Sequence, residues 1–394
     1  MKYVIIGNGP AGIYAAKKIR QNNSTAEIEI FSDSPHHFYS KPKLTTQYLA
    51  GDYPLEKLLI FKPDWYPEQN IKINLKTKIS QLNPDSHELA TESGQKISYD
   101  KLLIATGSTP FRLPIAGADS DKVFTIRTIE DVDQIKALIP QSQKAAIIGG
   151  GLLGLETANS ANVSNLEINI IEYFDYLLPR QLDKEGSTIL KELLEAKGLK
   201  FHLGISVAAI EDTNNQKLLK IKDGSELLVD FVIISTGIKP AIEIAKDAGI
   251  NTNKGIIVND YLETNIKDIY AAGDCAEHKG KIYGLWSAAM EQGEAAALTM
   301  MEKKTAYSGT TVSTMLKVAD IELASLGEID MEKNPKLKTI KGAVTENLKY
   351  QKLFLEENKV KGAIFIGSIK PAQKIKKMIK EQTIIANPNT ILEG

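Results

Sequence analysis

Two glycine-rich segments have the spacing that lets a backbone approach a phosphate closely. They are Gly7-Asn8-Gly9-Pro10-Ala11-Gly12 and Gly149-Gly150-Gly151-Leu152-Leu153-Gly154. Each follows an apolar run, 3–6 or 145–148, and leads into helix-forming residues. In a G-x-G-x-x-G segment the first glycine allows a tight turn, the second lets the backbone approach a pyrophosphate, and the third lets the helix pack against its strand. Free N–H groups at the helix start then favour an anion. The sequence therefore predicts two dinucleotide sites in one chain.

An acidic residue is expected at the end of the strand that follows each glycine segment, where it binds ribose hydroxyls. In the first unit Asp33 is the candidate, although Ser32 directly follows the strand and leaves a one-residue ambiguity. In the second unit Glu172 ends the expected strand 166–171, eighteen residues beyond Gly154. A carboxylate suits a free 2′-hydroxyl and repels a 2′-phosphate, so Glu172 predicts NADH rather than NADPH. The alternative for Glu172 is a solvated acid at a strand end.

Two further strands end in Thr-Gly, and they make the chain internally repetitive. The run 102–104 leads into Ala105-Thr106-Gly107, and the run from Asp230 ends in Ser-Thr-Gly237. The two glycine segments lie 142 residues apart, and each is followed by the same order of elements. The repeat predicts two duplicated nucleotide-binding domains. A third strand ends with Gly273 and Asp274.

Composition predicts a cytoplasmic protein that binds neither nucleic acid nor a membrane. The chain has 394 residues, a formal net charge of −1, 43% hydrophobic and 25% charged residues. No leader pattern is present at Met1, and no apolar stretch approaches the roughly 20 residues that span a bilayer. The segment 333–380 is basic, with thirteen lysines against three acids. This segment is either a docking surface for an acidic partner or a solvated face.

Cysteine and histidine usage excludes several kinds of chemistry. Cys275 is the single cysteine, so the chain has no internal disulfide, no C-x-x-C pair and no structural zinc site. At its position a small buried hydrophobe is the preferred interpretation over a redox role. The five histidines show no metal-ligand spacing, and no metal is expected.

The predicted fold class is α/β, with two Rossmann-like three-layer dinucleotide-binding domains and a small α+β C-terminal domain. Alternating apolar residues at 71–100 and 199–229 predict antiparallel strands within the two domains. Apolar runs after 310 and a lysine-rich helix at 371–381 predict the C-terminal domain. The predicted boundaries are 1–110 with 241–305 for the first domain, 111–240 for the second, and 306–394 for the third.

The order of these motifs resembles the FAD-dependent pyridine nucleotide oxidoreductases over nearly the whole chain. The resemblance implies that the first glycine segment binds the FAD pyrophosphate and that Asp274 binds the ribityl chain. It also implies that the second segment binds NADH and that the helix around Gln292 borders the isoalloxazine. The implied FAD residues are Gly7, Gly9, Pro10, Ala11, Gly12, Asp33, Lys41, Pro42, Ala105, Thr106, Gly107, Gly273, Asp274 and Gln292. The implied NADH residues are Gly149, Gly151, Leu152, Leu153, Gly154, Glu172 and Gly237.

Within that family, the loop Tyr39-Ser40-Lys41-Pro42-Lys43-Leu44 is similar to the loop of NADH:rubredoxin oxidoreductases. The resemblance makes Lys41 and Glu156 the flavin-side candidates, with no catalytic residue assigned. Related ferredoxin reductases carry in this loop a lysine that pairs with the glutamate corresponding to Glu156. Here that position is Thr46, so Lys41 and Lys43 are the candidate substitutes as partners of Glu156.

The absence of a thiol in this loop shapes the functional prediction. Disulfide reductases and related peroxidases of the superfamily pass electrons through cysteine, whereas residues 39–50 contain none. We therefore expect hydride transfer from NADH to FAD and single-electron transfer to a small iron protein, with rubredoxin preferred. The alternatives are a hydrogen-peroxide-forming NADH oxidase, a reductase of ferredoxin or a flavodiiron-type carrier, and a redox-responsive FAD-binding protein. The chain is expected to be a monomer or a homodimer.

Overall fold

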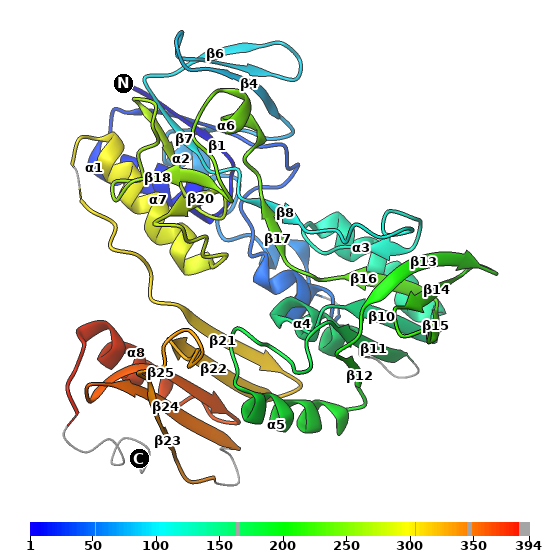
Figure 1. Cartoon of the computed structure of the whole chain (residues 1–394). Helices are drawn as coiled ribbons and strands as arrows, with labels where there is room; N and C mark the ends of the chain where they lie inside the picture. The colour runs from blue at the N-terminus through cyan, green and yellow to red at the C-terminus, as the bar shows by residue number, and fades with distance from the viewer. Residues whose placement is uncertain (52, 163–165, 304, 345–348, 386–394) are drawn as a thin grey trace. The chain divides into compact units, whose positions relative to one another are not determined.

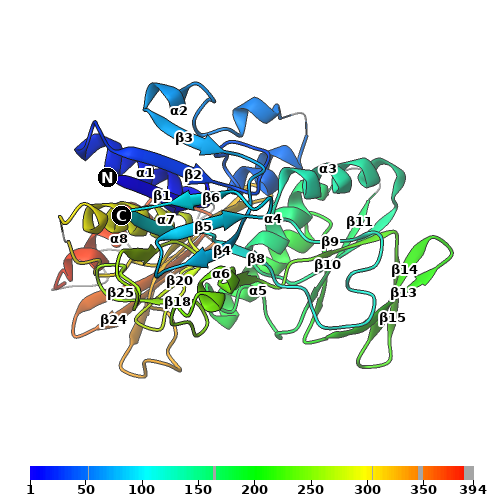
Figure 2. The ribbon, with the colours of Figure 1, turned by 90° about the horizontal axis from the view of Figure 1, so that it is seen from above.

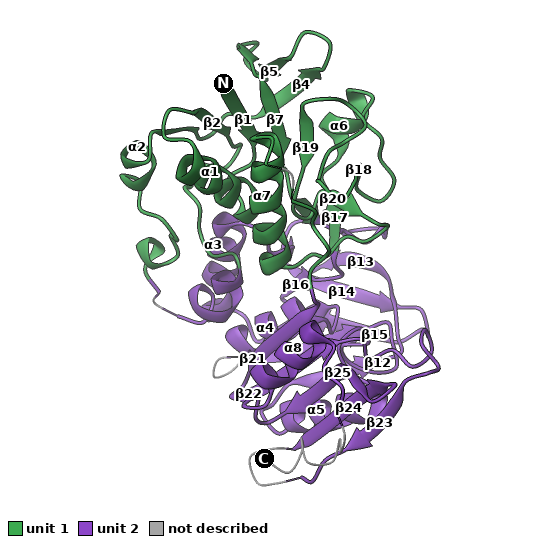
Figure 3. Ribbon diagram, turned by 90° about the vertical axis from the view of Figure 1, so that its left-hand side faces the viewer, with its two compact units in different colours: residues 1–41, 54–109, 238–310 green, residues 42–53, 110–237, 311–394 purple. Residues whose placement is uncertain are grey.

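The computed structural model describes residues 1–51, 53–162, 166–303, 305–344 and 349–385. The chain divides into two compact units, shown in different colours in Figure 3. Unit 1 comprises 1–41, 54–109 and 238–310, and unit 2 comprises 42–53, 110–237 and 311–394. Unit 2 thus contains the C-terminal segment together with the second glycine segment. The three domain boundaries drawn from the sequence stay predictions, and the last part of the third, 386–394, lies outside the described residues.

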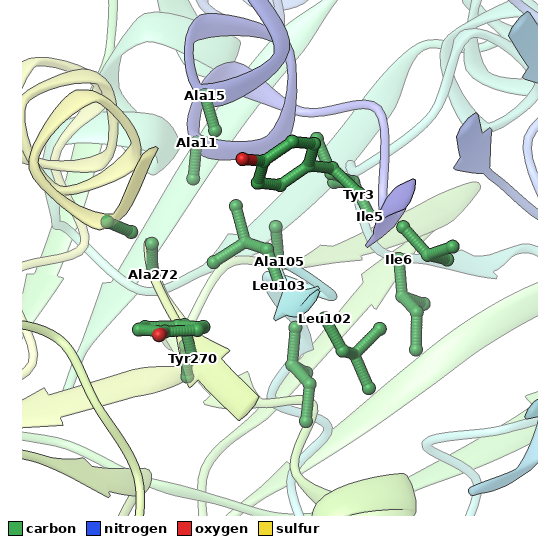
Figure 4. Packing of buried hydrophobic residues seen from close by; sticks show 14 of the residues in the cluster. Tyr3, Ile5, Ile6, Ala11, Ala15, Leu102, Leu103, Ala105, Tyr270 and Ala272 are labelled. Carbon is green, nitrogen blue, oxygen red and sulfur yellow. The ribbon is translucent and has the colours of Figure 1, made fainter. Parts of the chain in front are cut away.

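A five-stranded parallel sheet of order β19-β7-β1-β2-β3 forms the centre of unit 1. Its strands are apolar runs with both faces covered, as expected for a buried parallel sheet. Figure 4 shows Ala11 and Ala15 of α1 close to side chains of these strands. Helices α1 and α7 pack so closely that a Cβ on Gly293 would lie 2.2 Å from the Ala11 carbonyl oxygen. The elements are β1 (Lys2–Ile6), α1 (Pro10–Asn22), β2 (Glu27–Phe31), β3 (Ile71–Asn74), β7 (Lys101–Ile104), β19 (Ile269–Ala271) and α7 (Trp286–Met300).

Smaller elements complete unit 1. The alternating region after residue 78 forms a three-stranded antiparallel sheet, β4-β5-β6, as its pattern predicts (Figure 2). The strand at 71–74 instead joins the parallel sheet beside β2. The elements are a 3₁₀ helix (Leu55–Lys57), α2 (Trp65–Glu68), β4 (Ile79–Asn83), β5 (Glu88–Thr91), β6 (Lys96–Ser98), β8 (Ser108–Pro110), β17 (Ile238–Pro240), α6 (Glu243–Asp247), β18 (Ile256–Val258) and β20 (Ala276–His278).

Unit 2 repeats the same plan with a second parallel sheet, of order β12-β11-β10-β16-β9. The pairing registers of the two sheets correspond, because Ile148 pairs with Ile171 as Ile6 pairs with Phe31. An antiparallel sheet β13-β14-β15 accompanies it. The elements are β9 (Val123–Phe124), α3 (Ile129–Leu138), a 3₁₀ helix (Ile139–Gln141), β10 (Lys144–Ile148), α4 (Leu152–Ala161), β11 (Glu167–Glu172), α5 (Lys184–Glu195), β12 (Lys200–Leu203), β13 (Val207–Thr213), β14 (Gln216–Ile221), β15 (Glu226–Val229) and β16 (Phe231–Ile234).

The C-terminal part of unit 2 is an antiparallel five-stranded sheet with a helix (Figure 1). Its order is β21-β22-β25-β24-β23, and α8 buries Ala372, Ile375 and Ile379 in a cluster with residues of these strands. The predicted fold class is therefore confirmed in all three parts. The elements are β21 (Ser313–Val318), β22 (Ile321–Gly327), β23 (Lys338–Lys341), β24 (Tyr350–Glu356), β25 (Lys359–Ile366) and α8 (Ala372–Glu381).

One polar cluster joins this C-terminal sheet to α5. Asp183 caps α5 by accepting from the Gly186 amide at 3.0 Å. Its other oxygen accepts from the Tyr350 hydroxyl at 2.7 Å and from Lys352 Nζ at 2.5 Å. Burial opposes ionisation of Asp183, but the hydrogen bonds from Lys352, Tyr350 and Gly186 outweigh it and lower its pKa.

Asp183→Asn is expected to lower the melting temperature of unit 2. The substitution leaves Lys352, only 12% exposed, without its carboxylate, and breaking such a pair costs about 3 kcal/mol. Folding lowers the pKa of Asp183, so the ionised carboxylate stabilises the folded state. This stabilisation is fully present when the pH is above the pKa of Asp183 in the unfolded chain. It is lost as the pH falls through the pKa of Asp183 in the folded protein. Calorimetry at pH 7 and at acid pH measures both effects. Asp320→Asn, at a carboxylate 89% exposed, is the control. An Asp183→Asn melting curve that matches the control would contradict the prediction.

Candidate functional site

The first glycine loop has the three features that its spacing predicts. Gly7 has φ of +112°, and a Cβ there would lie 2.2 Å from the Ala105 carbonyl oxygen. A Cβ on Gly12 would lie 2.1 Å from the Gly7 carbonyl oxygen, so α1 sits directly against the strand turn. At Gly9 a Cβ would meet no atom within 4 Å. Gly9 is also the N-cap of α1, and no side chain caps this helix. The helix start therefore presents unpaired N–H groups beside open space.

Further residues predicted for FAD lie at the carboxyl ends of β7 and β19. Ala105, Thr106 and Gly107 directly follow β7, and the Thr106 hydroxyl donates to the Ala241 carbonyl at 2.7 Å. Gly273 and Asp274 follow β19. The Gly273 amide donates to Gln292 Oε1 of α7 at 2.8 Å, so this buried glutamine is fixed in orientation.

Ser108 belongs to this group as well, although the sequence motif alone assigns no role to its side chain. Its hydroxyl donates to Asp274 Oδ2 at 2.8 Å across 166 residues of chain. The available signal was a serine directly after the Thr-Gly ending. The hydrogen bond from Ser108 therefore fixes the orientation of the Asp274 carboxylate.

The register of the two sheets settles which residue corresponds to Glu172 in unit 1. The Gly7 amide donates to the Phe31 carbonyl and the Gly149 amide to the Ile171 carbonyl, both at 2.8 Å. Ser32 is therefore the counterpart of Glu172, and it is buried. Asp33 lies one residue further and is exposed. A ribose contact by Asp33 stays a prediction.

The second glycine loop repeats the first in its dimensions. Gly149 has φ of +115°, and a Cβ there would lie 2.2 Å from the Ser235 carbonyl oxygen. A Cβ on Gly154 would lie 2.0 Å from the Gly149 carbonyl oxygen, whereas a Cβ on Gly151 would meet nothing within 4 Å. Gly151 is the N-cap of α4, which has neither a side-chain cap nor an acid in its first turn. Leu152 and Leu153 open the helix, and Gly237 follows β16 with φ of +114°.

Glu172 is buried at the end of β11 and holds the second glycine loop. Its Oε2 accepts from the Gly150 amide at 2.6 Å, and its Oε1 accepts from the Phe174 amide at 2.9 Å. A carboxylate has about four acceptor positions, and these two hydrogen bonds use two of them. The interpretation of Glu172 as a solvated acid is therefore wrong, and its ribose contact stays a prediction.

Glu156 of α4 has a partner that the sequence reasoning did not name. The Thr45 hydroxyl donates to Glu156 Oε2 at 3.0 Å, whereas Lys43 donates to the Tyr53 hydroxyl. Thr45 lies on a π-helical turn, Leu44–Tyr48, in a segment that the sequence marked as a loop. Burial raises the pKa of Glu156, and the hydrogen bond from Thr45 offsets this in part. Thr45 thus supplies a neutral hydroxyl to this carboxylate, and Lys41 as a further partner stays a prediction.

A family model decides the class of the chain. Residues 1–293 match the model described as "Pyridine nucleotide-disulphide oxidoreductase". The chain belongs to this family. Residues 313–383 also match the model described as "Rubredoxin NAD+ reductase C-terminal domain". The small antiparallel domain of this oxidoreductase therefore has a recognised counterpart in rubredoxin reductases.

Individual relatives agree with the family. The chain is 35% identical to the assimilatory nitrate reductase electron transfer subunit of Bacillus subtilis, matching 100% of this chain and 51% of that protein. It is 34% identical to NADH-rubredoxin oxidoreductase of Clostridium acetobutylicum, over 99% of this chain and 97% of that protein. The solved structure of NADH:rubredoxin oxidoreductase from that organism superposes with a TM-score of 0.81, at 33% identity and 98% and 97% coverage. The chain spans about half the length of two of its curated relatives, both from Bacillus subtilis.

The oxidoreductase family bears out FAD and NADH as the predicted cofactors, and the two loops fit them. Gly9 and Gly151 each leave open the space that a side chain would fill. Each loop also ends in an uncapped helix start whose N–H groups suit a pyrophosphate. The residues of unit 1 would hold FAD, and those of the second loop would hold NADH. Among the described residues no helix is long and apolar enough to cross a bilayer.

Glu156→Gln is expected to raise the melting temperature at neutral pH and to leave it unchanged in acid. The pKa of Glu156 is raised on folding by burial, so its ionisation costs the folded state free energy. The difference in melting temperature between the variant and the unaltered protein should grow as the pH rises above 4.5, the ordinary pKa of a glutamate. It should become constant above the pKa of Glu156 in the folded protein. Glutamine keeps an acceptor for Thr45. Melting curves from pH 4 to pH 8 measure the difference, and a gap that is equal at every pH would contradict it.

Proposed function

We propose that the chain passes electrons from NADH, through bound FAD, to a small one-electron iron protein, with rubredoxin the first candidate. The single observation that carries this proposal is the lack of a usable thiol in a member of the disulphide oxidoreductase family. Cys275 is the sole cysteine of the sequence and is fully buried. Its Sγ lies 3.4 Å from the carbonyl oxygens of Ile104 and Ala272. Burial also raises the pKa of this thiol, which keeps it protonated.

A protein without a thiol relay has to deliver electrons from the flavin to an external acceptor. Bound FAD supplies the chemistry that accepts a hydride and releases electrons one at a time. The chain's own residues hold and orient the cofactors. In the proposal Asp274, fixed by Ser108, orients the ribityl chain, and Gln292, fixed by Gly273, sets the edge of the ring site. Glu172 does the same for the ribose of NADH.

The C-terminal domain supports an acidic protein as the acceptor. Exposed lysines of α8 line the face opposite its buried residues: Lys374, Lys377 and Lys380. Glu381 at the end of α8 pairs with Lys377 at 3.9 Å, so the helix keeps a positive excess and not charges of one sign. A positive excess on one surface speeds association with a partner of opposite charge. Part of the basic segment, 345–348, lies outside the described residues. The similarity of 313–383 to the rubredoxin reductase C-terminal domain favours rubredoxin over other acidic carriers.

Anaerobic stopped-flow spectroscopy tests the proposal. The purified FAD protein is mixed with NADH in the presence and absence of oxidised rubredoxin, and flavin and rubredoxin absorbances are followed. The expected result is rapid flavin bleaching followed by rubredoxin reduction that is much faster than oxygen consumption in a parallel aerobic run. Rapid bleaching with rubredoxin left oxidised would contradict rubredoxin as the acceptor. Turnover with NADH and air alone, unaffected by any carrier protein, would identify a hydrogen-peroxide-forming oxidase instead.

A further inference from the structure

A network of hydrogen bonds runs from the surface of unit 1 to a buried glutamine of α7. The Thr310 hydroxyl donates to Glu291 Oε2 at 2.5 Å, and the Tyr307 hydroxyl lies 2.6 Å from Thr310 Oγ1. Glu291 is exposed, whereas Tyr307 is buried. A further hydrogen bond joins the Tyr307 hydroxyl to the side chain of Gln292, which is only 1% exposed. The network thus connects an exposed carboxylate with a residue expected to border the isoalloxazine.

The hydrogen bonds of this network all point one way, and the carboxylate sets their direction. An ionised carboxylate only accepts hydrogen bonds, so the Thr310 hydrogen is used on Glu291 and Tyr307 donates to Thr310. Burial raises the pKa of Tyr307 to about 12, which keeps this donor protonated at neutral pH. Because the Tyr307 hydrogen is used, its oxygen accepts from Gln292 Nε2. Gln292 Oε1 accepts from the Gly273 amide at 2.8 Å, so both ends of the buried carboxamide are held.

We propose that Tyr307 is a positioning residue for the flavin, acting through Gln292, an inference that rests on the proposed binding of FAD in unit 1. The hydrogen bond to Tyr307 leaves Gln292 Nε2 one further hydrogen, whose direction is fixed. Preorganised donors stabilise developing negative charge without a cost of reorganisation. A reduced flavin is more electron-rich than an oxidised one, so a fixed donor at the edge of the ring site favours the reduced form. Loss of the Tyr307 hydroxyl should therefore make the midpoint potential of the bound flavin more negative.

The segment that carries Tyr307 is held independently of its hydroxyl. The Tyr307 amide donates to the Asp260 carbonyl at 2.7 Å, and the Tyr307 ring lies 5.0 Å from the His278 ring between centroids. The Thr310 amide donates to the Tyr283 hydroxyl at 3.3 Å. Tyr307→Phe keeps these backbone and ring contacts, so it removes hydrogen bonds of the network and leaves the packing in place.

The test measures the midpoint potential of the flavin in the FAD-loaded protein. Tyr307→Phe is titrated anaerobically with dithionite in the presence of a redox dye of known potential. The equilibrium constant for reduction of its flavin is expected to fall about threefold to tenfold, the net effect of one hydrogen bond. This fall corresponds to a potential about 15 to 30 mV more negative for a two-electron couple. Thr310→Val, which breaks the next link, is expected to shift the potential in the same direction by a smaller amount.

Tyr99→Phe is the matched control for the loss of a buried hydroxyl in unit 1. The Tyr99 hydroxyl is buried and has no hydrogen-bond partner within the described part of the chain. Its removal breaks no hydrogen bond, so the potential of the flavin should stay unchanged. An equal shift in Tyr99→Phe and Tyr307→Phe would show a general effect of losing a buried hydroxyl and would overturn the proposal.

The remaining outcomes separate the role of Tyr307 from the wider proposal. An unchanged potential in Tyr307→Phe, or a shift toward positive values, would overturn that role. If Tyr307→Phe does not retain FAD, an unchanged potential in Thr310→Val overturns it. Failure of the unaltered protein to bind FAD would overturn FAD binding in unit 1 and the role of Tyr307 together. A more negative potential with rubredoxin left oxidised by the unaltered protein would support the role of Tyr307 and contradict the acceptor alone.

Discussion

Gly9→Val is expected to give a folded protein that is purified without FAD. A Cβ at Gly9 meets no protein atom within 4 Å, and the residue has an extended backbone, so valine strains nothing in the chain itself. The new side chain instead occupies the space where the backbone is expected to approach the pyrophosphate. The measurement is the ratio of flavin to protein absorbance after purification, together with a circular dichroism spectrum.

Two other glycine variants define what this result means. Gly51→Val places the same side chain at another open glycine, and it should retain FAD. Gly7→Ala should instead impair folding, because the residue has φ of +112° and the new Cβ would lie 2.2 Å from a carbonyl oxygen. A yellow, FAD-loaded Gly9→Val protein would overturn the assignment of the first glycine loop.

The features that the sequence predicted well are those in which local sterics leave little choice. The glycine loops follow from backbone conformation at Gly7 and Gly149, where a side chain would collide with a neighbouring strand. Buried parallel strands follow from continuous apolar runs. These signals lie within a few residues of one another, so their spacing alone is informative.

The features that were missed depend on residues far apart in the chain. The hydrogen bond between Ser108 and Asp274 joins positions 166 residues apart, and that between Thr45 and Glu156 joins positions 111 apart. The π-helical turn at 44–48 follows a Lys-Pro-Lys segment that local rules mark as a loop. The C-terminal sheet likewise contacts α5 through Asp183. Its sequence position predicts only a helix cap and gives no sign of the hydrogen bonds from Tyr350 and Lys352.

Gly151→Val is expected to separate the two cofactors by keeping FAD and losing the reaction with NADH. The position corresponds to Gly9 in the second loop, and a Cβ there also meets no protein atom within 4 Å. The valine side chain would collide with the NADH pyrophosphate and displace it from the uncapped start of α4. An overpacking penalty of up to about 3 kcal/mol corresponds to a loss of affinity of about a hundredfold.

Anaerobic titration measures this separation directly. The Gly151→Val protein should be yellow, because the first loop in unit 1 is unchanged, and dithionite should still bleach its flavin. NADH should bleach it up to about a hundredfold more slowly at low nucleotide concentration, and ADP-ribose should bind correspondingly weakly. Gly51→Val should behave as the unaltered protein in both titrations. Normal bleaching by NADH would show that the nucleotide does not lie on the second glycine loop, whereas loss of FAD would show that the two loops are not independent sites.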